Sequence, residues 1–163
     1  MYILSATILL GTLFAYPDRM VKVNTGDVKT FAPVLSLKSF YRVARVVDGD
    51  TIDVDAGGAL LRLRLIGIDT PETVDPRKPV QCFGKEASDE AKQGFGVGYV
   101  RLETDPSQGT YDKYGRLLAY VYVPASSKQE GILINEYMIA KGYGHEYTYN
   151  LPYKYQTEFK AAE

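Results

Sequence analysis

Three short segments of alternating apolar and polar residues, separated by turn sequences, constrain the fold of this chain most strongly. Residues 41–47 (YRVARVV), 51–55 (TIDVD) and 60–68 (LLRLRLIGI) each follow the two-residue period of a β-strand. The sequences DGD and AGG that separate them are typical of tight turns. Strands joined by such short turns pair with one another in order, so the domain is expected to begin with an antiparallel meander.

The rest of the domain is predicted to supply two more strands and three helices. Strands are expected at residues 99–103 and 117–123. Helices are expected at residues 84–93, which end before Gly94, at 132–141, which end before Gly142, and from Pro152 towards Glu163. Five strands with a helix between the third and fourth predict a mainly β domain of the α+β class, a five-stranded OB-type barrel with about three helices.

The chain has 163 residues and 45% apolar content, which suits one domain, expected at residues 41–163. Residues 3–16 carry no charge, so residues 1–16 are predicted to be a signal peptide or a membrane anchor. The alternative is a buried N-terminal element of the domain. Residues 17–40 mix charges, Gly and Pro and are expected to form a linker. The protein is therefore expected outside the cytoplasm, secreted or membrane-anchored.

The net charge of -1 and the pI of about 5.9 exclude a strongly basic nucleic-acid-binding domain. Affinity for a polyanion must then come from a local patch or from a bound cation. Cys82 is the only cysteine, which excludes an intramolecular disulfide and a thiolate metal cluster. We expect Cys82 to be a small half-buried residue rather than a nucleophile.

Charged residues are concentrated in three motifs: DGDT at residues 48–51, RLIGIDTPE at 64–72 and DKYGR at 112–116. A hard divalent cation prefers carboxylate oxygens, and the forked donors of arginine match a phosphate. Within the second motif, Asp69 suits a metal ion, Glu72 can take a proton from water and Arg64 can bind an anion. A site that joins the three motifs could hold metal and phosphate together.

Each motif taken alone also has a purely structural interpretation. Asp53 and Asp55 share one face of a strand and are expected to be its solvated side, and neither register of an EF-hand calcium loop fits this region. The 112–116 motif is a plausible β-turn. In the tyrosine-rich segment 142–155, some rings are expected to pack against the last helix, while Tyr147 or Tyr149 faces a ligand. His145 is expected to be a surface or capping residue.

The motifs VVDGDT, RLIGIDTPET and DKYGR, in this order and with a GKEAS helix between the last two, resemble the staphylococcal (micrococcal) nuclease family of thermonucleases. The resemblance covers residues 41–163. It implies an OB barrel with helices and a Ca²⁺-dependent nuclease that hydrolyses DNA and RNA with little sequence specificity to 3′-phosphate products. Relative to the family, the last helix ends early, so the domain is expected to be truncated there.

The resemblance also implies roles for individual residues. The Ca²⁺ ligands would be Asp50, Asp69 and the Thr70 carbonyl, with Asp48 nearby. The scissile phosphate would be bound by Arg64 and Arg116, and Glu72 would orient or deprotonate the attacking water. The nucleotide would be held by Lys113, Tyr114, Tyr147 and Tyr149. The implied partner is DNA or RNA, single-stranded or frayed, with the protein a monomer that needs no protein partner. The alternative is a non-catalytic module of the same fold that binds nucleic acid or peptide.

Overall fold

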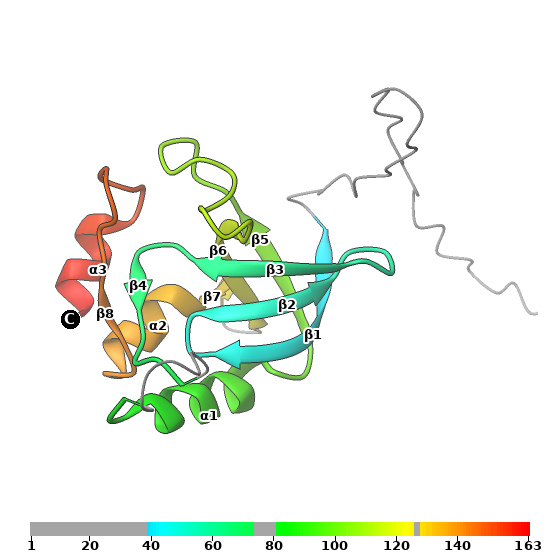
Figure 1. Cartoon of the computed structure of the whole chain (residues 1–163), viewed down its shortest axis with the longest axis horizontal. Helices are drawn as coiled ribbons and strands as arrows, with labels where there is room; N and C mark the ends of the chain where they lie inside the picture. Colours follow the sequence, from blue (N-terminus) through cyan, green and yellow to red (C-terminus); the bar gives the residue numbers. More distant parts are fainter. Residues whose placement is uncertain (1–38, 74–80, 126–127) are drawn as a thin grey trace, which may run out of the picture. The chain divides into compact units, whose positions relative to one another are not determined.

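The computed structural model describes residues 39–73, 81–125 and 128–163 (Figure 1). The expected signal or anchor segment, residues 1–16, and residues 17–38 of the expected linker lie outside the described residues. In the part of the chain that is described, no helix combines the length and the apolar character needed to cross a membrane.

The domain is a closed barrel of five strands, which confirms the predicted α+β class. The strands are β1 (Phe40–Asp48), β2 (Thr51–Asp55), β3 (Leu60–Leu65), β5 (Tyr99–Glu103) and β6 (Leu117–Ala125). They follow the order β3-β2-β1-β5-β6, and the parallel pairing of β3 with β6 closes the ring (Figure 1). The other four pairings are antiparallel, and the meander β1–β2–β3 matches the alternation in the sequence.

The predicted third strand was too long at its C-terminal end. β3 stops at Leu65, and Gly67 adopts a left-handed conformation with φ of 78°. The chain then forms β4 (Ile68–Asp69), which pairs antiparallel with β8 (His145–Glu146) in a second, two-stranded sheet. A left-handed residue cannot continue a β-strand, and glycine adopts this conformation without a steric penalty. This bend takes β4 out of the barrel ring and into the second sheet.

The helix predicted at residues 132–141 was placed too early in the chain, because the observed helix begins at Ile134. Ile132 and Leu133 belong to β7 (Lys128–Leu133), which pairs antiparallel with β6, and α2 (Ile134–Ala140) follows directly. Strand pairing with Val123 and Tyr122 therefore overrides the helical period at these two positions. β7 lies outside the closed ring.

The other two helices also differ from the prediction at one end. α1 (Gly84–Phe95) continues through Gly94. Phe95 adds a buried residue four positions after Ala91, and its burial outweighs the loss of about 1 kcal/mol of helix stability that a glycine causes. α3 (Gln156–Ala162) begins later than Pro152 and inserts Phe159 fully into the core.

Asn135 at the start of α2 ties the barrel together beneath the three motifs. Its Nδ2 donates to the Ile66 carbonyl at 2.8 Å, and its Oδ1 accepts from Val121 N at 3.0 Å. Asn135 is completely buried, so these bonds are shielded from water. They fix the chain just after Arg64 against β6.

Asp53 lies on the solvated face of β2, as predicted, but its own carboxylate is covered rather than solvated. Only 3% of the residue is exposed, and Arg45 and Arg62 both form ion pairs with its carboxylate at 2.7 Å. The hydrogen bond from Arg62 is the largest influence on Asp53 and lowers its pKa despite burial. The two arginines cover the carboxylate, which is why alternation alone misjudged its exposure.

Candidate functional site

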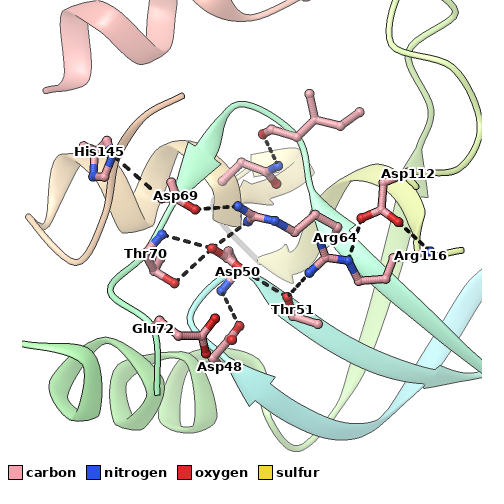
Figure 2. Close-up of polar contacts among 12 residues, drawn as sticks. Asp48, Asp50, Thr51, Arg64, Asp69, Thr70, Glu72, Asp112, Arg116 and His145 are labelled. Atoms are coloured by element: carbon pink, nitrogen blue, oxygen red, sulfur yellow. Dashed lines mark hydrogen bonds and ion pairs between the residues drawn. The ribbon is translucent and has the colours of Figure 1, made fainter. Parts of the chain in front are cut away.

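The three charged motifs meet at one end of the barrel (Figure 2). β2 pairs with β3 so that Thr51 lies opposite Arg64, and the parallel β3–β6 pairing sets Arg64 opposite Leu118, two residues after Arg116. The central position of β3 therefore places Arg64 between the first and the third motif.

Asp50 is the most connected carboxylate in this cluster. Its Oδ2 accepts hydrogen bonds from the backbone N–H of Thr70 at 2.9 Å and from the Thr70 hydroxyl at 3.1 Å. Its Oδ1 accepts from the Thr51 hydroxyl at 2.9 Å. The side chain is buried, and these bonds hold the turn between β1 and β2 against the segment that follows β4.

Arg64 lies between two carboxylates. Its Nη1 is 2.6 Å from Asp50 Oδ2, and its Nη2 donates to Asp69 Oδ1 at 2.7 Å. The Arg64 side chain is only 13% exposed, and its buried Nη1 forms the ion pair without the alignment of a hydrogen bond. A guanidinium with donor capacity left over can donate a hydrogen bond to an anionic oxygen.

Arg116 is positioned by the loop that carries it. Its Nε donates to Asp112 Oδ2 at 2.6 Å, and Asp112 Oδ1 accepts from the backbone N–H of Arg116 at 2.9 Å. Arg116 Nη1 reaches the Thr51 hydroxyl at 3.5 Å, so a chain of contacts joins Arg116 through Thr51 to Asp50 (Figure 2). Burial would raise the pKa of Asp112, but hydrogen bonds from Arg116 and Tyr114 lower it overall, which keeps the carboxylate charged.

Negative charge accumulates on the other side of Asp50. Burial raises the pKa of Asp48 to about 7, and the charges of Asp50 and Glu72 add to this effect. Asp48 Oδ1 also accepts from the backbone N–H of Asp50 at 3.3 Å. Carboxylates that oppose one another's ionisation mark a place where a cation would be stabilised.

Gln81 holds the backbone of Glu72 with two hydrogen bonds. Glu72 N donates to Gln81 Oε1 at 2.8 Å, and Gln81 N donates to the Glu72 carbonyl at 3.0 Å. This clamp joins the strand end to the residues that lead into α1. Nothing in the sequence pattern pointed to Gln81, because its partner is a backbone group nine residues earlier in the chain.

A family model described as "Staphylococcal nuclease homologue" matches residues 62–163. The match covers more than half of the chain and includes Arg64, Asp69, Glu72 and Arg116. The chain belongs to the staphylococcal nuclease homologue family.

Curated relatives agree with membership of the staphylococcal nuclease homologue family. A thermonuclease of Staphylococcus hyicus is 45% identical over 123 residues, which are 76% of this chain and 68% of the relative. A thermonuclease of Staphylococcus intermedius is 54% identical over 83 residues, and endonuclease YncB of Bacillus subtilis (strain 168) is 46% identical over 89 residues. The matched regions cover 48% and 42% of these two relatives, so the chain spans about half or less of their length.

The donor atoms in this member of the staphylococcal nuclease homologue family suit a hard cation. Asp50, Asp69, Thr70 and Asp48 offer only oxygen ligands, the type that Ca²⁺ prefers. Among the described residues, no three acidic, His or Cys side chains already surround a common point. Arg64 instead bridges Asp50 and Asp69, so the two carboxylates are held near each other by a protein cation.

The residues expected to hold the nucleotide lie on two sides of this cluster. Tyr114 is 72% exposed, and its ring centroid is 5.3 Å from Arg116 Cζ and 5.1 Å from Lys113 Nζ. Tyr147 and Tyr149 are exposed beyond β8, with ring centroids 6.3 Å apart. The structure thus brings Lys113 and Tyr114 to the Arg116 side, whereas the other two tyrosines lie on the β8 side.

Two predictions about neighbouring residues have different outcomes. His145 is exposed as expected, but the pairing of β4 with β8 brings its Nε2 to 4.0 Å from Asp69 Oδ2. Cys82 is exposed rather than half-buried, because it lies in the turn before α1. Thr51 and Asp112 position Arg116, a role that no pattern in the sequence predicted.

Proposed function

We propose that this protein is a nuclease that hydrolyses phosphodiester bonds of DNA and RNA with little sequence specificity and leaves 3′-phosphate products. The observation that carries the proposal is the pair of guanidinium groups, Arg64 and Arg116, linked through Thr51 and Asp50 beside Asp69 and Glu72. Thermonucleases and endonucleases among the relatives support the same reaction class.

In the proposed reaction, Arg64 and Arg116 bind the non-bridging oxygens of the scissile phosphate. These oxygens gain negative charge as water attacks phosphorus, so both arginines stabilise the transition state more than the bound substrate. The bond from phosphorus to the 5′ oxygen breaks as the bond to the water oxygen forms. The phosphate stays on the 3′ side, and the 5′ oxygen leaves as a hydroxyl after it takes up a proton.

Glu72 is proposed to orient the attacking water and to accept its proton. Its backbone is fixed by Gln81, and its charge acts on Asp48 and therefore lies close to the carboxylate cluster. A positioned general base contributes about 10² to 10⁴ in rate.

Asp50, Asp69 and the Thr70 carbonyl, with Asp48 nearby, are proposed to bind Ca²⁺. When bound, the ion supplies Lewis-acid stabilisation of the charged phosphate. The protein side of this arrangement is the set of hydrogen bonds from Thr70 and Thr51 that orients the Asp50 carboxylate.

We further propose that the substrate is single-stranded or frayed nucleic acid, since Tyr114, Tyr147 and Tyr149 expose rings on which unpaired bases can stack. The protein is proposed to act as a monomer without an obligate protein partner. The uncharged segment at residues 3–16 supports export from the cytoplasm, either as a secreted protein or with a membrane tether.

The decisive experiment is hydrolysis of single-stranded DNA and RNA by the purified protein with millimolar Ca²⁺, with Mg²⁺ or with EDTA. We expect cleavage with Ca²⁺, loss of activity in EDTA, and a Glu72→Gln variant slowed by about 10² to 10⁴ in kcat. Glu86→Gln is the matched control, because Glu86 is an exposed residue in the first turn of α1. Intact substrate with the wild-type protein would support a non-catalytic binding module instead, and a fully active Glu72→Gln variant would overturn the role proposed for Glu72.

A further inference from the structure

Phe83, which is half exposed, and Tyr143, which is half-buried against the core, form an aromatic pair that the proposed function does not use. Their ring centroids are 5.9 Å apart with an interplanar angle of 24°. Phe83 precedes the first residue of α1, and Tyr143 lies in the turn between α2 and β8. Figure 1 shows the start of α1 and this turn close together at the same end of the domain.

Phe83 combines two unfavourable features. Half of the residue is exposed to solvent, and it is the only non-glycine residue with positive φ, 67°, among the described residues. A left-handed conformation is disfavoured for a bulky side chain, and strain of this kind is concentrated at functional sites. Burial does not compensate for the strain, so core packing alone explains this residue poorly.

The pair adjoins the strand end that carries Asp69 and Glu72. Next to Phe83, Gly84 packs so closely that an added Cβ would lie 3.1 Å from the Pro71 carbonyl oxygen. Next to Tyr143, an added Cβ on Gly144 would lie 2.9 Å from the Asp69 carbonyl oxygen. Each ring is therefore carried by a residue whose neighbouring glycine contacts the backbone of this strand end.

The half-buried Tyr143 directly precedes a row of exposed rings. After Tyr143, exposure alternates along the chain, with His145, Tyr147 and Tyr149 exposed and the residues between them half-buried. The middle member, His145, is in register with Asp69. The row thus runs past the candidate metal ligand, with Tyr147 and Tyr149 on one side of it and the Phe83–Tyr143 pair on the other.

We propose that Phe83 and Tyr143 form a second base-stacking subsite, which binds a base of a single-stranded nucleic acid on the side of Asp69 opposite to Tyr147 and Tyr149. This inference rests on the proposed nuclease function. A ring face stacks on any base, so the subsite adds affinity without sequence specificity. It extends contact with the strand beyond the rings of Tyr114, Tyr147 and Tyr149.

The test uses a hexathymidylate in which the central linkage is a phosphodiester and all other linkages are methylphosphonates, so that one bond alone can be cleaved and the register is fixed. A series of such oligonucleotides carries a single abasic residue at each position in turn. For the wild-type protein, loss of the base that occupies the subsite is expected to raise KM by about five-fold or more.

Phe83→Leu and Tyr143→Leu are each expected to abolish this sensitivity at that one position and to leave it unchanged elsewhere. Phe83→Tyr keeps the ring and should retain it. Tyr99→Leu is the matched control, because Tyr99 is 55% exposed and pairs with Arg42 at the opposite end of β1 from Asp48. Thermal unfolding checks that each variant is folded, and Tyr143→Leu tests the subsite even where Phe83→Leu is unstable.

The outcomes separate the two proposals. If the wild-type protein cleaves the complete oligonucleotide but both leucine variants keep the wild-type sensitivity at every position, the subsite does not exist and the nuclease function stands. If the wild-type protein does not cleave the oligonucleotide with Ca²⁺, the nuclease function is overturned and the subsite with it.

Discussion

At the scale of single residues, the two arginines of the candidate site are held by different kinds of partner. Arg64 contacts Asp50 and Asp69, which are themselves proposed metal ligands, so a change at either carboxylate would alter metal and arginine together. Arg116 is held by Asp112, which is not a proposed ligand. Asp112 is therefore the residue through which the position of one arginine can be tested separately.

We predict that Asp112→Ala lowers kcat/KM for single-stranded DNA by about 10- to 100-fold, the scale of a misplaced catalytic group. The substitution removes the acceptor of Arg116 Nε and of two backbone N–H groups in the loop. Ca²⁺ affinity, measured by calorimetry, should stay at the wild-type value. A parallel loss of Ca²⁺ affinity would contradict the assignment.

Asp55→Ala is the control for this variant. Asp55 also accepts one backbone N–H, from Gly58, and one arginine, Arg42, but it lies at the far end of β2 from the site. We expect Asp55→Ala to leave kcat/KM unchanged.

At the scale of secondary-structure elements, the segment that carries Glu72 is positioned by contacts from elements distant in the sequence. The Gln81 clamp joins the end of β4 to the residues before α1. Gly67 allows the bend between β3 and β4, and the rings of Tyr153 and Phe159 pack against it.

Gln81→Ala is predicted to lower kcat by roughly ten-fold or more with little change in KM, because Glu72 loses the acceptor that fixes its backbone. Gln81→Glu keeps an oxygen acceptor at the same position and should restore most of the rate. Gln93→Ala, an exposed change within α1, is the control. Equal rates for Gln81→Ala and Gln93→Ala would show that the clamp does not position Glu72.

Gly67→Ala is predicted to destabilise the domain by about 2–4 kcal/mol in urea unfolding, since the new methyl group would lie 2.6 Å from the Tyr153 ring. Gly57→Ala is the matched control, with a φ of 72° and no atom within 4 Å of the added methyl group. Gly57→Ala should cost only about 1 kcal/mol of backbone strain. Similar losses for both variants would mean that packing against Tyr153 is unimportant.

At the scale of the whole domain, the C-terminal segment is attached to the barrel through the buried carboxylate of Asp105. It accepts hydrogen bonds from Tyr120 Oη at 2.8 Å, from Lys154 N at 2.8 Å and from the Ser107 hydroxyl at 2.8 Å. Burial would raise the pKa of Asp105, but these bonds lower it overall below the usual 3.8. The charged form therefore stabilises the native state.

Asp105→Asn is predicted to lose about 1.5–3 kcal/mol of stability near neutral pH. Because the folded-state pKa of Asp105 is lowered, its contribution is complete above pH 3.8 and is lost as the pH falls through the folded-state value. Urea unfolding of the two proteins should therefore differ most at pH 5–7 and converge below pH 3.8. Asp89→Asn, at an exposed ion pair on α1, should change stability little. A difference that is constant from pH 7 to pH 2.5 would contradict the role of the charge.

Local sequence signals predicted the parts of the domain that depend on local contacts. The alternation of β1, β2 and β3 requires only neighbouring residues and short turns, and those strands formed where expected, apart from the end of β3. The errors at Ile132 and at Asp53 arose where a residue on the neighbouring strand, Val123 or Arg45, changed the environment. The periodicity of apolar residues within one segment carries no information about such partners.

The sequence by itself determined the chemical types in the candidate site: carboxylates for a cation, arginines for a phosphate and tyrosines for bases. Only the tertiary structure decided which of them meet. The parallel β3–β6 pairing set Arg64 beside the Arg116 loop, and the β4–β8 pairing brought His145 to Asp69. The physical reason is that these pairings join segments separated by long stretches of chain, so they are selected by burial and strand closure of the whole barrel rather than by local conformational preference.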